Sequence, residues 1–212
     1  KYNLGGDAPV LPATSGRRRI LVPGQVEDDL SVLRGAGAVR TNLALLQAVR
    51  AEHVNAFIVF KPHPDVEAGY RRGAVQRDQA AALADLILDH APMAPLLTQI
   101  DEVYTLTSLT GFEALLRGLR VTCWGQPFYA GWGLTEDRAP MPRRVRRLTI
   151  DQLVAGALIL YPRYHDPVTE LPTTPEALLD RLADPAPWRG GIVARLRRWQ
   201  GAAMARMAKG RG

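Results

Sequence analysis

A histidine held between two prolines is the first candidate for chemistry in this sequence. In "KPHPDV" (61–66) each proline biases the residue before it toward extended backbone, so Lys61 and His63 are held extended at little entropic cost. A lone histidine is more often structural than functional. One positioned in this way suits donation to a phosphate, with Lys61 as additional positive charge.

Hydroxyl groups crowd a second stretch, "LTSLTGFEALLRG" (106–118), where an apolar run gives way to a helical pattern. One interpretation is helix capping, with Thr110 as the cap and Glu113 completing a capping box. The other is a phosphate site, because the unpaired N–H groups and the dipole at a helix start attract anions. This stretch alone favours capping and leaves both interpretations open.

Three consecutive carboxylates follow Gln25 in "GQVEDD" (24–29), namely Glu27, Asp28 and Asp29. Adjacent acids repel one another unless a cation, a helix start or a hydrogen-bond donor relieves them. A hard cation needs more oxygen ligands than three successive side chains can aim inward, so no metal site is expected. The alternatives are a carboxylate that attacks or stabilises a cationic sugar centre, and a charged turn.

A fourth motif, "CWGQPFYAGWG" (123–133), combines large rings with glycines. Its aromatic residues are Trp124, Phe128, Tyr129 and Trp132. The glycines would let backbone approach a ligand or a neighbouring domain, and the alternative is an aromatic cluster packed under a loop.

The elements that must position these motifs alternate along the chain. Short apolar runs predict strands over 18–24, 56–64, 102–108 and 120–125, and helical spacing predicts helices over 38–54, 78–90, 111–118 and 149–160. This alternation predicts an α/β fold, a Rossmann-like parallel sheet with helices on both faces. Each motif follows a predicted strand, so all four should meet at the carboxyl edge of the sheet, where ligands bind.

Composition narrows the function classes. The chain has 212 residues, is 47% hydrophobic and carries a formal charge of +6. Seven basic residues and no acid lie in 188–212, and without those charges the remainder has a net charge of −1, so nucleic acid is not an expected partner. Cys123 is the sole cysteine, which excludes an intrachain disulfide and fits a reducing compartment. No apolar run approaches the about 18 residues of a membrane span.

The basic tail over 191–210 has helical spacing, with apolar residues on one face and arginines on the remainder. Such a helix fits an anionic membrane surface, and packing on a partner half-domain fits equally well. The chain begins with Lys1 rather than Met, so we expect a piece of a longer protein.

Taken together, "VPGQVEDD", "KPHPDV" and "LTSLTGFEALLRGLRVTCWGQPFYAGWGLT" resemble the capsule polysaccharide β-Kdo transferases of the KpsC type, over roughly 18–135. The resemblance implies a GT-B-type fold of two Rossmann-like halves, the donor CMP-Kdo, transfer with retention of configuration, and no further cofactor. It implies that this chain is the nucleotide-binding half of one module, most naturally the C-terminal module. The acceptor would be a growing poly-Kdo linker on a capsule lipid anchor. Other capsule assembly transferases would be partners, at the cytoplasmic face of the inner membrane.

The resemblance also implies roles for particular residues. His63, aided by Lys61, would contact the CMP phosphate or ribose, Glu113 would bind ribose hydroxyls, and Asp29 would be the nucleophile in a Q-x-x-x-D pattern that begins at Gln25. Glu27 and Asp28 are competing candidates for the nucleophile. The phosphate would be cradled by a group of residues at the helix start: Ser108, Thr110, Gly111 and Phe112.

We therefore expect a linker over 1–17, a CMP-sugar-binding domain over 18–165 and a C-terminal extension over 166–212 that carries the basic helix. Because the acceptor half is missing or reduced, this piece could be inactive alone. Two alternatives stand beside the transferase. One is a CDP-alcohol phosphotransferase of the teichoic-acid type, which would need no sugar nucleophile. The other is a non-catalytic nucleotide-binding scaffold, which would tolerate loss of the acidic motif.

Overall fold

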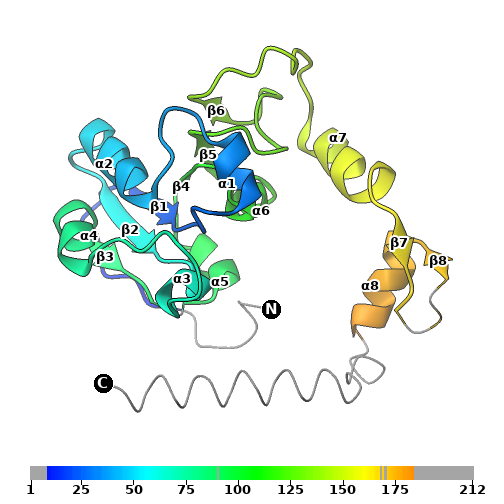
Figure 1. The fold of residues 1–212 in the computed structure, drawn as a ribbon, viewed down its shortest axis with the longest axis horizontal. Helices are drawn as coiled ribbons and strands as arrows, with labels where there is room; N and C mark the ends of the chain where they lie inside the picture. The colour runs from blue at the N-terminus through cyan, green and yellow to red at the C-terminus, as the bar shows by residue number, and fades with distance from the viewer. Residues whose placement is uncertain (1–8, 90, 168, 170, 184–212) are drawn as a thin grey trace. The chain divides into compact units, whose positions relative to one another are not determined.

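Six strands form a single sheet: β1 (Arg19–Pro23), β2 (Phe57–Lys61), β3 (Leu86–Ile87), β4 (Glu102–Thr105), β5 (Arg120–Cys123) and β6 (Glu136–Asp137). Their order across the sheet is β3-β2-β1-β4-β5-β6, and every neighbouring pair is parallel (Figure 1). The structure is a computed structural model, and it describes residues 9–89, 91–167, 169 and 171–183. The predicted Rossmann-like α/β sheet is confirmed.

Helices follow the strands in the same part of the chain: α1 (Leu30–Gly35), α2 (Asn42–Glu52), α3 (Pro64–Glu67), α4 (Arg77–Leu83), α5 (Met93–Leu97), α6 (Leu109–Leu115) and α7 (Ile150–Val154). Helices α1 to α6 lie around the sheet, on both of its sides (Figure 1). Helix α2 packs against α4, while α6 packs against β4 and β5. The described residues up to Leu153 form one compact unit, and those from Val154 form a second.

The core lies along the central strands, which are buried on both faces. Leu21 of β1 is in register with Val59 of β2 and Val103 of β4, and none of the three is exposed. Every residue of β2 is buried. Covered parallel strands are apolar in nearly continuous runs rather than alternating, which is why sequence alone located them.

One predicted helix is wrong in its second half. The pattern over 78–90 predicted a continuous helix, but α4 ends at Leu83 and Ala84 is extended, with φ −108° and ψ 141°. The backbone of Asp85 donates to Ile58 O at 2.9 Å, and its carboxylate accepts from Ile58 N at 2.9 Å. Pairing with β2 therefore turns the following residues into the edge strand β3.

The predicted helix over 149–160 is present as α7 followed by a π-helical turn, η1 (Ala155–Leu160). Thr149 caps this helix: its Oγ1 accepts from Gln152 N at 3.2 Å, and Gln152 Oε1 accepts from Thr149 N at 3.0 Å. The two reciprocal bonds make a capping box.

The second unit contains η1, a hairpin of β7 (Tyr164–His165) and β8 (Pro172–Thr173), and α8 (Pro175–Ala183). Arg181 Nε binds the Asp166 carboxylate at 2.9 Å, which ties α8 to the residue that follows β7. Within the described residues, no helix is both long and apolar enough to cross a bilayer. The predicted basic helix over 191–210 lies outside the described residues.

Candidate functional site

The four motifs follow β1, β2, β4 and β5, and because these strands are parallel they share the carboxyl edge of the sheet. In this strand order the connections change direction between β1 and β4, which is where α/β proteins bind ligands. The candidate site is therefore built from the residues that follow β1, β2 and β4.

Close backbone contacts join the ends of these strands. Gly24 N donates to Lys61 O at 2.7 Å, and a Cβ at Gly24 would lie 3.0 Å from both His63 N and Pro62 Cα. The glycine therefore lets the end of β1 pass against the His–Pro segment. On the other side, Gln25 Oε1 accepts from Thr107 N at 2.9 Å, which joins the end of β1 to the end of β4.

Gln25 is nearly fully buried, at 5% exposure. Its backbone N donates to Asn42 Oδ1 at 2.9 Å, and its backbone O accepts from Asn42 Nδ2 at 2.8 Å. Its side-chain oxygen accepts from Thr107 N, whereas its Nε2 has no hydrogen-bond partner in the structure. Gln25 therefore positions the strand ends, and both N–H groups of its side-chain amide remain for a further acceptor.

His63 caps the short helix α3. Its Nδ1 accepts from Asp65 N at 3.2 Å, so the neutral ring carries its proton on Nε2. Burial is the main cause that lowers the pKa of His63, and it outweighs the opposing charge of Asp65. At neutral pH the imidazole is therefore a fixed N–H donor without a charge.

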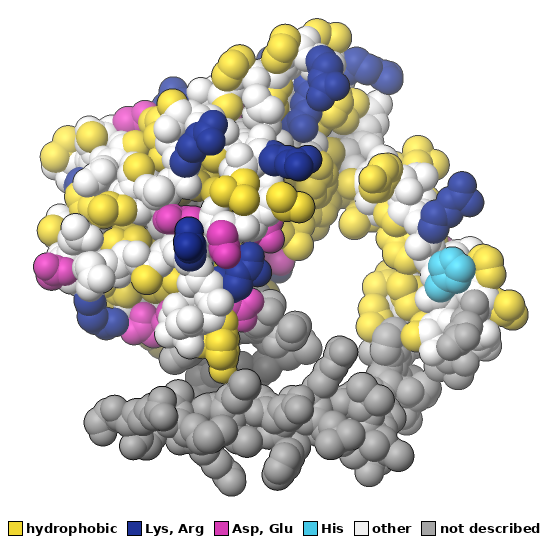
Figure 2. Space-filling model, in the orientation of Figure 1, with side chains coloured by type: hydrophobic (Ala, Val, Ile, Leu, Met, Phe, Trp, Pro, Cys, Tyr) yellow, Lys and Arg dark blue, Asp and Glu magenta, His cyan; other side chains and the backbone are white. Residues whose placement is uncertain are grey.

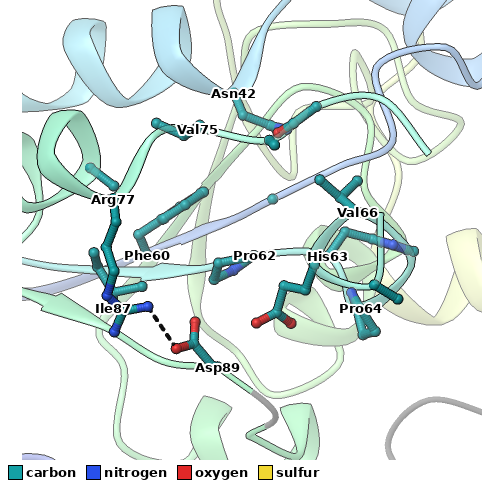
Figure 3. Close-up of a pocket in the computed structure, with 16 residues that line it drawn as sticks. Asn42, Phe60, Pro62, His63, Pro64, Val66, Val75, Arg77, Ile87 and Asp89 are labelled. Atoms are coloured by element: carbon teal, nitrogen blue, oxygen red, sulfur yellow. Dashed lines mark hydrogen bonds and ion pairs between the residues drawn. The ribbon is translucent and has the colours of Figure 1, made fainter. Parts of the chain in front are cut away.

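A cavity of about 510 Å³ opens beside this histidine (Figure 3). Its apolar wall includes Phe60, Val75 and Ile87, and the ion pair between Arg77 and Asp89 (2.9 Å) borders it. Residues of the α6 start are not among those that line it. The cavity thus extends from the His–Pro segment toward β3, on the side away from β4.

The three carboxylates of the acidic motif have different environments. Glu27 Oε1 accepts from Asn42 N at 2.7 Å, at the first residue of α2. Asp28 forms a half-exposed ion pair with Arg71 at 3.2 Å. Glu27 and Asp28 therefore have structural partners that the sequence did not reveal.

Asp29 is the N-cap of α1, and its Oδ1 accepts from Ser31 N at 2.8 Å. Hydrogen bonds from Ser31 are the main cause that lowers its pKa, and the charges of Arg71 and His63 act in the same direction. In turn, the charge of Asp29 acts to raise the pKa of His63. Asp29 is therefore an exposed, ionised carboxylate within electrostatic range of the imidazole.

The helix cap at the α6 start differs from the prediction. Ser108, not Thr110, is the N-cap, and its hydroxyl accepts from Thr110 N at 3.2 Å. The predicted Thr110–Glu113 capping box is wrong for this reason. Gly111 N donates to Ser108 O at 3.1 Å, so the amides of Thr110 and Gly111 both already have acceptors. Ser108 thus contributes a hydroxyl proton to this edge, and the backbone contributes less than expected.

The aromatic motif supports the same helix start. Tyr129 is fully buried and its hydroxyl donates to Ser108 O. A Cβ at Gly111 would lie 2.2 Å from that hydroxyl, so the glycine admits the tyrosine ring rather than a ligand. Phe112 and Phe128 pack with ring centroids 5.1 Å apart. The interpretation of an aromatic cluster under a loop is therefore confirmed for these rings.

Thr107 lies in the hydroxyl-rich stretch at the end of β4 but was not among the predicted site residues. Its hydroxyl lies 3.3 Å from Gln25 Oε1 and 3.5 Å from Ser31 Oγ. Since Ser31 also donates to Asp29, a chain of polar contacts runs from Asp29 to the residue that precedes Ser108. The signals for Thr107 in the sequence were the crowding of hydroxyl residues in this stretch and its position after the predicted strand over 102–108.

Lys61 and Glu113 complete the predicted set. Lys61 is only 4% exposed, and burial lowers the pKa of its ammonium group against the charges of Glu67 and Asp89. It is not among the residues that line the cavity. Glu113 lies in the middle of α6 and is partly buried. Among the described residues, no three His, Cys, Asp or Glu side chains are grouped as a metal site.

Comparisons with known proteins agree on one family. Residues 7–165 match the family described as capsule polysaccharide biosynthesis protein. The capsule polysaccharide modification protein LipA of Neisseria meningitidis (serogroup A) is 53% identical over 169 residues, which are 80% of this chain and 24% of LipA. The lipopolysaccharide-processing protein LpsZ of Rhizobium meliloti is 47% identical over 166 residues, 77% of this chain and 38% of LpsZ.

Two solved structures from Thermosulfurimonas dismutans are similar across most of the chain. The KpsC β-Kdo 2,7 transferase has a TM-score of 0.74 at 42% identity, covering 82% of this chain and 56% of its own. The KpsC β-Kdo 2,4 transferase has a TM-score of 0.72 at 34% identity, covering 87% and 57%. The chain thus spans 24% of LipA, 38% of LpsZ and just over half of each solved chain.

Proposed function

The chain belongs to the capsule polysaccharide biosynthesis protein family, and we propose that it is the nucleotide-binding half of a retaining β-Kdo transferase that uses CMP-Kdo. Similarity to two proteins named as β-Kdo transferases supports a role in Kdo transfer. The second half of a GT-B-type enzyme would complete the cleft, and the transferred Kdo would extend a poly-Kdo linker on a capsule lipid anchor.

The observation that carries the proposal is the convergence of a neutral N–H donor, an ionised carboxylate and a set of hydroxyls at one sheet edge. His63, Asp29 and Ser108 follow three adjacent strands, β2, β1 and β4. The chain of polar contacts through Ser31 and Thr107 joins the end of β1 to the end of β4. A phosphate at this edge would accept from His63 Nε2 and from the hydroxyls at the α6 start, and each donor contributes on the order of 2–4 kcal/mol to stabilising a departing charge.

Asp29 has the properties that a double displacement requires. Its low pKa keeps it ionised, and its carboxylate is exposed at the edge of the sheet, where a reacting centre could approach it. The carboxylate would attack the anomeric carbon of Kdo as the bond to the CMP oxygen breaks, and CMP would leave with that electron pair. An acceptor hydroxyl would then attack the same carbon, lose its proton and release Asp29, so that two inversions restore the configuration.

Mass spectrometry of the protein after brief exposure to CMP-Kdo tests this assignment. We expect an adduct of one Kdo on the peptide that contains residues 20–34. The Asp29→Asn variant should lose it, because an amide is a poor nucleophile, and it should remain folded because asparagine caps helices as well as aspartate does. The matched control is Asp28→Asn, which removes the neighbouring charge and should retain the adduct. An undiminished adduct in Asp29→Asn would exclude Asp29.

The remaining elements of the proposal follow from the same activity. The donor would be CMP-Kdo with no additional cofactor, and the acceptor a Kdo-bearing lipid, shared with other capsule assembly transferases. Work on a lipid-linked acceptor would place the protein on the cytoplasmic side of the inner membrane. The basic sequence over 191–210, together with anionic lipid, would hold it there.

A further inference from the structure

An arginine-rich segment lies between β6 and α7, outside the candidate donor site. We name residues 141–147 the arginine loop. Residues 138–149 contain five arginines and no acid. In Figure 2 dark-blue side chains gather at the top, over the segment that leads from β6 toward α7. Arg143, Arg146 and Arg147 are exposed, and the ion pairs within the described part of the chain use other arginines.

Arg144 fixes this loop to the aromatic motif. Its Nη1 donates to the backbone oxygens of Pro127 and Ala130, the latter at 2.7 Å, and its guanidinium lies 5.6 Å from the centroid of the Trp132 ring. The Arg144 side chain therefore has a structural role. These contacts of Arg144 hold the backbone of the loop in place and do not involve the guanidinium groups of Arg143 and Arg146.

Two glycines of the aromatic motif make room for the loop. Gly131 has φ +81°, and a Cβ there would lie 2.9 Å from Met141 Sδ and 3.0 Å from Arg144 Cδ. Gly133 has φ +78°, and its Cβ would lie 3.1 Å from Arg147 Nε. Left-handed backbone and close approach both require glycine at these positions. The "GWG" sequence therefore serves to seat the arginine loop.

The loop is also connected to the candidate site. Ala130, whose oxygen binds Arg144, follows Tyr129, whose hydroxyl binds Ser108 O at the α6 start. Phe128 packs on Phe112 one turn into the same helix. The arginine loop is therefore braced against the element that would hold the donor phosphate, and it lies on the β5–β6 side of the sheet.

We propose that the exposed guanidinium groups of Arg143 and Arg146 bind the carboxylates of an acidic saccharide chain, the acceptor of the transfer reaction. The guanidinium fork matches a carboxylate in two parallel hydrogen bonds. A chain that carries one carboxylate per sugar would engage a row of arginines as it leaves the site. This inference rests on the proposed function, since it identifies the acceptor as a polyanion and gives it a path.

Binding of a short Kdo oligosaccharide to the whole chain tests the proposal, with its carboxyl-reduced counterpart and CMP as further probes. We expect Arg143→Gln/Arg146→Gln to bind the oligosaccharide about tenfold more weakly, since hydrogen bonds to charged groups are lost. Its affinity for CMP should be unchanged. The carboxyl-reduced probe should bind the wild type and the glutamine variant with the same affinity. The affinity of Arg143→Lys/Arg146→Lys for the acidic oligosaccharide should lie between those of the wild type and the glutamine variant, because lysine keeps only the charge.

The control for net charge is Arg34→Gln/Arg117→Gln, two exposed arginines on α1 and after α6, which should bind the acidic probe like wild type. Equal binding of the acidic probe by wild type and the loop variant would overturn the proposal, as would no binding by wild type. It would also be overturned if the loop variant lost only its binding to phosphatidylglycerol vesicles, because the loop would then face a membrane. CMP binding by the wild-type protein separates these results from a failure of the proposed function. The proposed function predicts that CMP binds, whereas the proposal for the arginine loop makes no prediction about whether CMP binds.

Discussion

At the scale of single residues, hydrogen-bond partners distinguish side chains that look equivalent in sequence. Three consecutive acids offer three nucleophiles, but Glu27 binds the first amide of α2 and Asp28 pairs with Arg71. Asp29 is exposed and interacts electrostatically with His63. The same distinction applies to His63, whose Nδ1 is used by Asp65 N. Each local bond fixes which atom is presented to a ligand.

The lowered pKa of His63 predicts a pH effect on stability. Because the folded protein holds this proton less tightly than the unfolded chain, the stabilising contribution is complete above about pH 6.5 and declines as the pH falls through that value toward the folded pKa. We expect the free energy of unfolding to fall more between pH 7.5 and 5.5 in wild type than in His63→Gln. Urea titrations at the two pH values measure this difference.

His165→Gln, at an exposed position, is the matched control for replacing a histidine with glutamine. Identical pH profiles for wild type and His63→Gln would show that His63 titrates alike in the folded and unfolded chain.

CMP binding should then be examined with His63→Gln at pH 7.5, where the loss of the imidazole Nε2 donor is expected to weaken the affinity for CMP about tenfold.

At the scale of elements, one carboxylate decides where α4 ends. Asp85 accepts from Arg17 Nη2 at 2.6 Å, from Arg50 Nη2 at 2.5 Å and from Ile58 N at 2.9 Å. Burial raises the pKa of Asp85, but these hydrogen bonds outweigh burial and the net pKa is lowered. The carboxylate thus joins the segment before β1, the end of α2 and β2, and it starts the edge strand.

Asp85→Asn should therefore be one of the more damaging polar substitutions in the fold. We expect a loss of about 2–4 kcal/mol at pH 7, since charged hydrogen bonds to two arginines are lost. The loss should shrink as the pH falls from about 3.8 toward the lower folded pKa of Asp85, because the stabilising contribution is complete above the unfolded pKa and is lost as the pH falls through the folded one. Chemical denaturation measures it. Asp89→Asn, which breaks a surface pair with Arg77, should cost less than about 1 kcal/mol. Equal costs would contradict the account.

These examples show why the sheet could be predicted and some of its details could not. Central strands such as β2 are buried throughout, so their apolar runs are visible in sequence. The positions of the motifs at strand ends followed from the parallel order. By contrast, the bond from Asn42 N to Glu27 and the fit of Gly111 against Tyr129 join residues 15 and 18 positions apart in the chain, and no local pattern encodes them. The end of α4 depends on Asp85 in the same way.

At the scale of the whole molecule, positive charge is unevenly distributed. The seven basic residues of 188–212 account for the formal charge of +6, and they lie outside the described residues. The described residues divide near Leu153, whereas the family match continues to residue 165. We propose that the donor site belongs to the first unit and that the terminal sequence serves for attachment.

Deleting 190–212 should lower the affinity for phosphatidylglycerol vesicles and remove most of its salt dependence, because each basic residue near an anionic surface contributes about 1 kcal/mol. Vesicle sedimentation at 50 and 300 mM salt measures this effect. Vesicles of phosphatidylcholine provide the control and should bind neither form. Unchanged binding after the deletion would indicate that the tail packs on protein instead.

The most direct test of the central claim is a crystal structure of the protein with CMP. The account predicts that the phosphate lies within hydrogen-bonding distance of His63 Nε2 and of the Ser108 hydroxyl, with Asp29 facing the position that the sugar would occupy. A CMP molecule whose phosphate contacts neither His63 nor the start of α6 would contradict it.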